Sequence, residues 1–313
     1  MNQVRLVFLG TSAGTPSRER NLAAMALVMD GRALLFDCGE GTQQQILRSS
    51  VRAGAIEAIF ISHMHGDHLY GLPGLLATMS LHGRSAPLAV FGPERVAQYL
   101  RGVYEASYAH TSFDLTIHAV SDGATIARDG YDVHARLLDH TAPCLGFCVI
   151  EHDRSGAFDL ARAQALGVPA GPLFGALQKG RDVTLDDGRV VRSADVVGPP
   201  RAGRRIVYCT DTRPCAAAIE LARGADILVH EATYGDDMAA EAGERGHSTA
   251  ADAARVAAKA GVQRLVLTHI SPRYTDAAPL LAQARAIFPE TELAADFAEV
   301  QAPLGRHLTD PPR

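Results

Sequence analysis

Short apolar runs separated by polar, glycine-containing turns occur along most of the 313-residue chain, and such runs predict β-strands. Two of them, Ala24–Met29 and Arg32–Phe36, flank Asp30-Gly31, a dipeptide that favours a type I′ hairpin turn. Further runs predict strands at residues 4–9, 58–61, 88–91, 115–120, 131–138, 146–151, 205–208, 226–230 and 265–267.

Longer segments between these strands predict helices at residues 71–81 and 93–109, and a polar helix extends through Arg48. An Ala-rich helix at 249–260 has Ser248 or Thr249 as its N-cap. We therefore expect an α/β fold that forms a single domain over residues 1–313. Two β-rich halves, with strands at 131–138 and 146–151 completing the first, would form a sandwich of two sheets flanked by helices.

The segment FISHMHGDHLYGL, residues 60–72, follows a buried strand and contains His63, His65, Asp67 and His68. Imidazoles at i and i+2 project to one side of an extended segment, and Gly66 lets the backbone turn so that the next two residues face the same volume. Three imidazoles and a carboxylate are ligands of the kind that zinc takes, with manganese or iron as alternatives. A polar turn with solvated histidines is the other interpretation, but H-x-H-x-D-H favours a metal site.

Two polar segments have no obvious place in a core. Residues 16–21, PSRERN, form a loop with two guanidinium groups, and a solvated loop is the simplest interpretation. Residues 154–200 contain a short helical pattern at 159–166, a Gly/Pro-rich stretch and a hairpin signal at Asp187-Gly188. We expect an inserted, protruding arm or a plain surface insertion there. Asp37, at the end of a strand, is either a helix N-cap or an acceptor for a metal-bound histidine.

The composition is that of an ordinary globular protein, with 47% hydrophobic and 21% charged residues. A net charge of −5 argues against a general nucleic-acid coat protein, so an RNA substrate would need a local basic feature or metal ions. The chain lacks a run of about 20 apolar residues and a signal-peptide pattern. Five cysteines without C-x-x-C spacing indicate reduced thiols, and together these features predict a cytoplasmic protein.

The H-x-H-x-D-H motif after a buried strand resembles that of the metallo-β-lactamase superfamily of dinuclear metallohydrolases. From about Val4 to about Val300 the chain is similar to ribonuclease Z, the family of endonucleases that remove 3′ trailers from precursor tRNA. The segments FDCGEGTQ at 36–43 and DHTAP at 139–143 also match that family. The resemblance implies an αββα sandwich with a protruding exosite arm, and a homodimer.

The resemblance also implies a ligand set for two Zn²⁺ ions, with Mn²⁺ as an alternative. One ion would be held by three histidines, namely His63, His65 and His140. The other would be held by Asp67, His68 and His269. Asp211 would lie between the ions, although an Asp before Thr can instead be a helix N-cap. Likewise, a lone His after a strand, such as His140, can be structural.

In the same family pattern, Asp67 would orient or deprotonate the attacking water. His247 would be the general acid, held and charged by Glu231, although a simple loop histidine is the alternative. Cleavage would leave a 3′-hydroxyl on the tRNA and a 5′-phosphate on the trailer.

The resemblance also implies functions for the two polar segments, residues 16–21 and 154–200. The family has a P-x-K-x-R-N loop that discriminates the tRNA 3′ end; Pro16, Arg20 and Asn21 match it, and Arg18 replaces the lysine. The family's exosite arm grips the tRNA elbow, and the matching arm residues here are Gly171, Pro172, Gly175, Lys179 and Gly180. Gln178 stands where a lysine is usual, and Lys179, Arg181 and Arg189 would supply local positive charge.

Two other functions remain open on the sequence. A small-molecule phosphodiesterase or sulfatase would use the same metal site but lack the arm and the arginine-containing loop. A non-catalytic RNA-binding or scaffold protein with vestigial metals is the other reading, and the complete ligand set argues against it. The remaining histidines, His230 among them, are interpreted as structural.

Overall fold

In the computed structural model, which describes residues 4–303, the chain divides into two compact units. The first comprises residues 4–128, Val133–Val149 and Arg205–Pro303, and the second comprises Asp129–Asp132 and Ile150–Arg204. Among the helices within 4–303, none combines the length and hydrophobicity that crossing a membrane requires.

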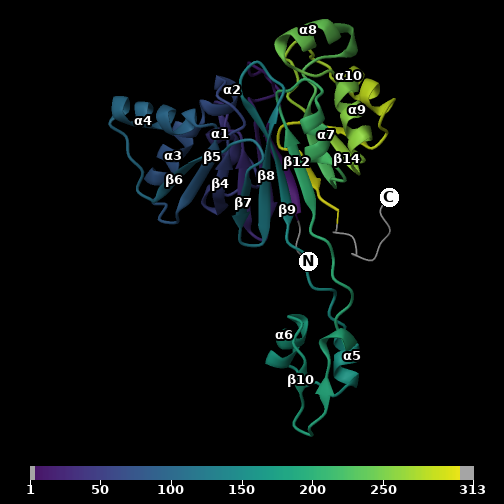
Figure 1. The fold of residues 1–313 in the computed structure, drawn as a ribbon. Coiled ribbons are helices and arrows are strands. Elements are labelled where there is room, and N and C mark those ends of the chain that lie inside the picture. Colours follow the sequence, from purple (N-terminus) through teal and green to yellow (C-terminus); the bar gives the residue numbers. More distant parts are fainter. Residues whose placement is uncertain (1–3, 304–313) are drawn as a thin grey trace. The chain divides into compact units, whose positions relative to one another are not determined.

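The first unit contains two seven-stranded sheets (Figure 1). One sheet has the order β16-β1-β2-β3-β4-β5-β6, antiparallel from β16 to β3 and parallel from β3 to β6. Its strands are β1 (Val4–Gly10), β2 (Ala24–Met29), β3 (Arg32–Phe36), β4 (Ile56–Phe60), β5 (Leu88–Gly92), β6 (Leu115–Ala119) and β16 (Glu299–Gln301). The expected hairpin turn is present, because Asp30 and Gly31 between β2 and β3 both have positive φ.

The other sheet has the order β15-β14-β13-β12-β9-β8-β7, and β12 to β15 are parallel. Its strands are β7 (Thr125–Arg128), β8 (Tyr131–Leu138), β9 (Cys144–Glu151), β12 (Arg205–Cys209), β13 (Ile227–Glu231), β14 (Arg264–Thr268) and β15 (Thr291–Leu293). The expectation of two successive halves is therefore wrong for these strands. β9 pairs with β12, so that β7, β8 and β9 lie in the same sheet as the later strands, and β16 near the end of the chain returns to pair with β1.

Helices pack on both sheets, as the α/β sandwich prediction requires. Their bounds are α1 (Thr42–Arg48), α2 (Gly66–Leu69), α3 (Leu72–Leu81), α4 (Arg95–Ser107), α7 (Ala216–Ala222), α8 (Ala239–Arg245), α9 (Ala250–Ala260) and α10 (Ala278–Arg285), with 3₁₀ turns at η1 (Ala53–Ala55) and η3 (Asp236–Met238). The 3₁₀ turn η2 (Ser193–Asp195) belongs to the second unit. Residues of α1, α3 and α4 share one core cluster with the first sheet, and α7 and α9 pack on β12 to β14.

Aromatic side chains fill the space between the sheets. Phe36 and Phe60 of the first sheet lie 6.0 and 5.4 Å, ring centroid to ring centroid, from Phe147 of the second, and Tyr208 lies 5.6 Å from Phe36. Such large buried rings contribute strongly to a core and fix the spacing of the two sheets. The strand ends that carry the polar motifs are thereby held on a rigid frame.

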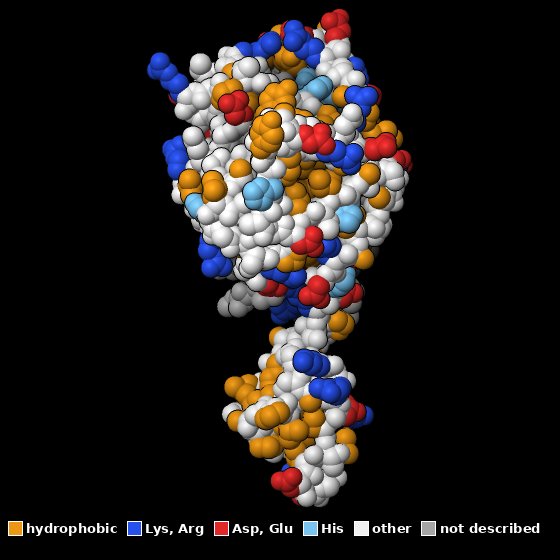
Figure 2. All heavy atoms as spheres, turned by 90° about the vertical axis from the view of Figure 1, so that its left-hand side faces the viewer, with side chains coloured by type: hydrophobic (Ala, Val, Ile, Leu, Met, Phe, Trp, Pro, Cys, Tyr) orange, Lys and Arg blue, Asp and Glu red, His pale blue; other side chains and the backbone are white. Residues whose placement is uncertain are grey.

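The second unit has secondary structure of its own, namely α5 (Leu160–Ala165), α6 (Pro172–Gln178), and the hairpin of β10 (Val183–Thr184) and β11 (Val190–Val191). Its buried apolar residues form a separate cluster that includes Leu177 of α6. The stretch expected to be irregular thus contains a helix, because Gly171, with φ of 145°, lets the chain turn and Pro172 occupies the first helical turn. Figure 2 shows hydrophobic and basic side chains together on the surface of this unit.

Candidate metal centre

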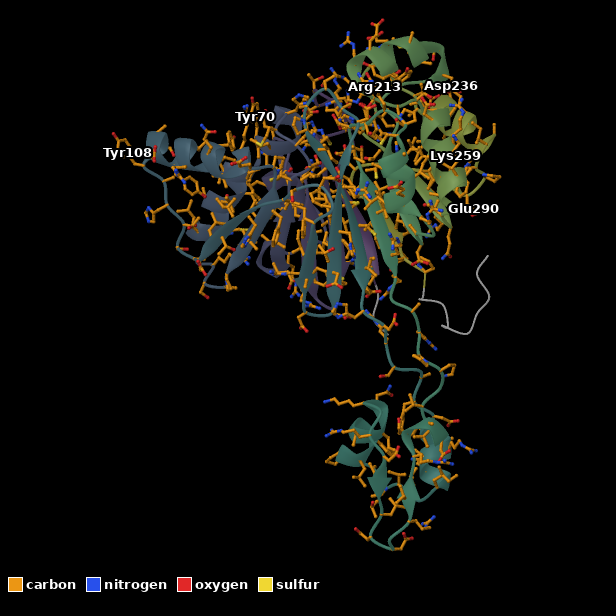
Figure 3. All side chains as sticks on the ribbon, viewed as in Figure 1. Tyr70, Tyr108, Arg213, Asp236, Lys259 and Glu290 are labelled. Atoms are coloured by element: carbon orange, nitrogen blue, oxygen red, sulfur yellow. The ribbon has the colours of Figure 1, made fainter. Side chains whose placement is uncertain are left out.

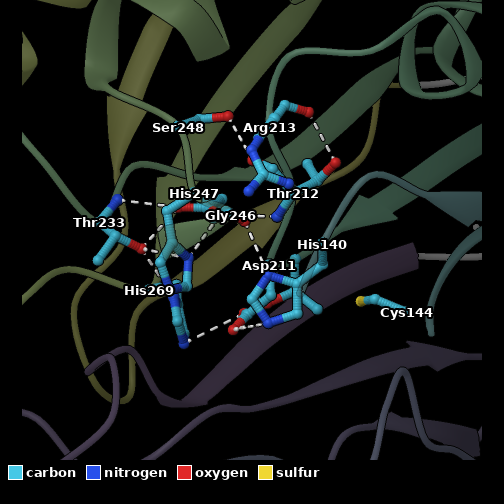
Figure 4. A network of polar contacts seen from close by, with 12 residues as sticks. His140, Cys144, Asp211, Thr212, Arg213, Thr233, Gly246, His247, Ser248 and His269 are labelled. Atoms are coloured by element: carbon cyan, nitrogen blue, oxygen red, sulfur yellow. Dashed lines mark hydrogen bonds and ion pairs between the residues drawn. The ribbon is translucent and has the colours of Figure 1, made fainter. Parts of the chain in front are cut away.

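Seven histidine and aspartate side chains meet where strands of both sheets end. His63, His65, Asp67 and His68 follow β4 and lead into α2, whereas His140 follows β8, Asp211 follows β12 and His269 follows β14. All seven predicted ligands belong to the first unit, and the structure brings every one of them together (Figure 4 shows part of the group).

The donor atoms form two main groups, within each of which all the atoms lie within 4.8 Å of one another. The first group contains His63, His65, His140 and Asp211, and the second contains Asp67, His68 and His269. Asp211 connects them, because its Oδ2 lies 3.6 Å from His63 Nε2 and its Oδ1 lies 3.2 Å from His68 Nε2. An overlapping group joins Asp211 and His269 to His247.

The inward-facing nitrogens converge on one another as metal ligands do. His68 Nε2 lies 3.2 Å from His269 Nε2, and His63 Nε2 lies 3.0 Å from His65 Nδ1. The opposite nitrogens of these rings already have partners: His68 Nδ1 is 2.8 Å from Asp37 Oδ2, and His269 Nδ1 is 3.0 Å from Thr233 Oγ1. Rings fixed on one side, with their free lone pairs meeting on the other, fit a divalent cation.

Asp37 orients the His68 ring in this arrangement. It is fully buried and accepts hydrogen bonds from the Ser62 backbone and hydroxyl groups at 2.7 and 2.9 Å, and from the Tyr208 hydroxyl at 2.9 Å. Of the two roles that the sequence left open, its geometry matches the acceptor for a metal-binding histidine, because the N-cap position of α1 is occupied by Gly41.

The orientation of His140 depends on a helix end. Its Nδ1 lies 2.7 Å from the carbonyl oxygen of Gly246, the αL C-cap residue of α8, with φ of 79°. Arg213, labelled in Figures 3 and 4, holds this segment through bonds to the Gly243 carbonyl and to Asp139. Sequence reasoning missed Gly246, because a helix-capping glycine carries no sign of what its carbonyl contacts.

His247 forms a pair with Glu231 beside the ligands. His247 Nδ1 is 2.9 Å from Glu231 Oε1, and the buried Glu231 also accepts bonds from the Thr212 backbone at 2.7 Å and the Thr233 hydroxyl at 2.6 Å. Burial lowers the pKa of His247, but the negative charge and hydrogen bond of Glu231 outweigh burial and raise the pKa to about 9. Glu231 is therefore the group that favours the protonated form of the His247 ring.

The loop at residues 16–21 lies near this centre but is engaged with the protein. Gly14, just before it, donates its backbone N–H to Asp67 Oδ2 at 2.8 Å. The Arg20 guanidinium donates to the Thr11 hydroxyl and the Ala294 carbonyl, both at 2.7 Å, and Asn21 Nδ2 donates to the Glu40 carbonyl at 2.9 Å.

The exposed Arg18 is therefore the side chain of this loop best placed to meet a ligand. Arg20 and Asn21 hold the shape of the loop.

The arm residues singled out in the sequence, Gly171, Pro172, Lys179 and Arg181, all lie in the second unit. Lys179 and Arg181 are exposed, and neither side chain has an ion-pair partner among residues 4–303. Gln178, which stands where a lysine was expected, is half-buried and donates to the Gly156 carbonyl at 3.0 Å. It therefore has a hydrogen-bond partner within the second unit.

The metal centre opens into a pocket of about 470 Å³. Besides the ligands and His247, its wall includes Tyr234, Arg245 and Arg273, which sequence reasoning did not single out. These residues have no metal-binding pattern, and only the folded chain places them beside the ligands.

Comparison with known proteins defines the class to which this site belongs. Residues 178–270 match the family described as Beta-lactamase superfamily domain, and residues 4–143 match the family of the Anti-Pycsar protein Apyc1. The fold is similar to that of YhfI of Bacillus subtilis, described as a metallo-beta-lactamase fold protein, with 17% identity and a TM-score of 0.70 over 96% of this chain and all of that one. The fold and the His/Asp cluster together define a metallo-β-lactamase-fold protein with a divalent-metal site.

Within this class the similarity is specific. The chain is 45% identical to ribonuclease Z of Gloeothece citriformis over 98% of both chains, and 48% identical to that of a Synechococcus species over 95% of this chain and 96% of the relative. The crystal structure of human tRNase Z, short form, is 30% identical with a TM-score of 0.69, covering 96% of this chain and all of that one. The chain belongs to the ribonuclease Z family.

The contact between Gly246 and His140 predicts a specific effect of Gly246→Ala. A Cβ there would lie 2.8 Å from His140 Nδ1, so the histidine must move, and we expect weaker metal binding by the group that contains it. The matched control is Gly261→Ala at the C-cap of α9, where φ is also positive but a Cβ meets nothing within 4 Å. Metal affinity measured by titration should fall only for Gly246→Ala; equal affinities in both variants would contradict this role of Gly246.

Proposed function

We propose that this protein is a metal-dependent endoribonuclease that removes the 3′ trailer from precursor tRNA and leaves a 3′-hydroxyl on the tRNA and a 5′-phosphate on the trailer. The observation that carries the proposal is the complete convergence of seven His and Asp donors beside the His247–Glu231 pair, in a chain of the ribonuclease Z family. We place this activity in the cytoplasm, because the five cysteines are free thiols.

We assign the site to two Zn²⁺ ions, with Mn²⁺ as the alternative metal. His63, His65 and His140 would hold one ion, Asp67, His68 and His269 the other, and Asp211 would be shared, as the two donor groups suggest. When bound, such ions lower the pKa of a water molecule and neutralise the charge on phosphoryl oxygens.

The side chains supply the proton transfers and the orientation. Asp67, which accepts a bond from the Gly14 N–H, would orient the attacking water or accept its proton. His247 donates its proton to the departing 3′-oxygen of the tRNA, a poor leaving group without such help. Glu231 keeps His247 protonated and fixes its ring through the 2.9 Å contact.

Substrate recognition is assigned to two regions. Arg18 would contact the 3′ end of the tRNA, in a loop shaped by Arg20 and Asn21. Residues 154–200 would be an exosite arm inserted into the domain that we assign to residues 1–313. The separate apolar cluster of these residues supports an insertion with a small core of its own. The arm would meet RNA through Gly171, Pro172, Lys179 and Arg181, and the family likeness leads us to propose a homodimer.

Removing the metal should abolish activity and lower the melting temperature. A ligand that binds only the folded state stabilises it by RT ln(1 + [L]/Kd). A chelator that withdraws the metal from the imidazole and carboxylate donors removes this stabilisation of the folded state. We expect elemental analysis to find two zinc ions per chain, and added Zn²⁺ to restore both properties. A chelated protein that still cleaves precursor tRNA, or one ion per chain at saturation, would contradict the assignment.

His247→Ala should keep its metal content and lose most of the cleavage rate, about 10²-fold or more, because general acid catalysis contributes about 10²–10⁴-fold. His110→Ala, at an exposed histidine, is the matched control and should behave as the unmodified protein. The rate is measured with precursor tRNA at saturating substrate, and the metal by elemental analysis. Loss of metal from His247→Ala would make this residue a ligand, which its proximity to Asp211 and His269 also allows.

The arm assignment predicts a selective defect in Lys179→Gln/Arg181→Gln. Loss of two unpaired cations should raise KM for precursor tRNA and reduce the salt dependence of binding, with little effect on a small activated phosphodiester. Arg192→Gln is the control in the same unit, because Arg192 already pairs with Asp195. Equal KM values for the double variant and the control would argue against an RNA-binding arm. An intact protein that hydrolyses only the small diester would instead favour a small-molecule phosphodiesterase.

A further inference from the structure

Two arginines in the wall of the metal pocket share one carboxylate. Arg245 Nε lies 3.0 Å from Glu241 Oε1, and Arg273 Nη2 lies 3.5 Å from the same oxygen. The three side chains are 64%, 38% and 30% exposed for Arg245, Arg273 and Glu241, so all of them are reached by solvent. The cluster has one positive charge more than Glu241 can balance.

Other contacts fix Arg273 in place. Its Nε donates to the Ser271 hydroxyl at 3.1 Å, and its guanidinium lies over the ring of Tyr234 with Cζ 4.9 Å from the centroid. A guanidinium held against an aromatic ring, beside another arginine, is a preorganised donor site for a phosphate, whose oxygens can accept two parallel N–H bonds from it.

The position of the cluster relative to His247 decides which part of an RNA it would meet. The Tyr234 ring lies 6.0 Å from that of His247, and Arg245 precedes His247 by two residues. Because His247 protonates the departing 3′-oxygen, the nucleotide that keeps this oxygen must lie on the His247 side of the metals. That nucleotide is the last one retained on the tRNA, whereas the first trailer nucleotide keeps the phosphate.

We propose that Arg245 and Arg273 bind the phosphodiester on the 5′ side of the last retained nucleotide, and that Glu241 occupies their donors until this phosphate displaces it. The proposal rests on the proposed function and adds a binding site to it. Tyr234 is buried and holds the Arg273 guanidinium in place beside this phosphate. The site binds the tRNA body and not the trailer, so the trailer can dissociate after cleavage.

The test combines protein variants with single neutral linkages in the RNA. Precursor tRNA is made with a methylphosphonate either on the 5′ side of the last retained nucleotide or between the first two trailer nucleotides. For the unmodified protein, we expect the first substitution to raise KM about tenfold, the effect of losing one charged hydrogen bond. In Arg273→Gln the same substitution should cause no further rise. The trailer substitution should affect both proteins equally.

Glu241→Gln separates binding from a folding defect, because it is expected to change KM in the opposite direction. Removing the competing carboxylate should lower KM for unmodified precursor tRNA, a result that a damaged fold cannot produce. Arg255→Gln is the matched control: Arg255 is an exposed arginine in α9 that pairs with Asp252 and does not line the pocket.

Three results would overturn the proposal. The first is that Arg273→Gln and the tRNA-body methylphosphonate raise KM independently, so that their effects multiply. The second is that the effect of Arg273→Gln on KM is coupled to the trailer methylphosphonate instead. The third is a raised KM in Glu241→Gln. Normal cleavage of precursor tRNA without coupling would refute this site alone. Hydrolysis of a small activated diester without any cleavage of precursor tRNA would refute the proposed function and the site together.

Discussion

The buried carboxylate of Asp37 is the constraint on which the metal centre depends. It lies at the end of β3 in the first sheet, accepts a bond from Tyr208 in the second sheet, and fixes the ring of His68 between them. Burying a carboxylate costs several kcal/mol unless its oxygens accept hydrogen bonds. Moving Tyr208 or His68 away from Asp37 would therefore destabilise the folded state. One side chain thereby links the two sheets and sets the direction of the His68 ring, a predicted ligand.

Much of the centre was predictable because its ligands follow strands that the hydrophobic pattern identifies. His63, His65 and His68 form a local motif, and the turn at Asp30-Gly31 has the residues that its backbone angles require. The distant members, Asp211 and His269, were assigned by resemblance to a family, because spacing in sequence does not reveal which strand ends meet. The ligand roles themselves remain predictions, now supported by the distances between donor atoms.

The features that sequence reasoning missed are those created by tertiary contacts. The pairing of β16 with β1 joins residues almost 300 positions apart, and only the folded chain shows it. Glycine and proline around residue 171 were interpreted as loop signals, although the same residues start α6. The carbonyl of Gly246 and the shared carboxylate of Glu241 have roles that depend on partners from other elements.

The separate apolar cluster of residues 150–204 has an evolutionary consequence. Substitutions in that cluster alter the stability of the second unit without disturbing the side chains that pack the sheets of the first. Selection can therefore act on the inserted unit and on the hydrolytic centre as two nearly independent traits. Under the RNA-binding role proposed for this insertion, a lineage that replaces it changes the RNAs it recognises and inherits the hydrolytic chemistry unaltered.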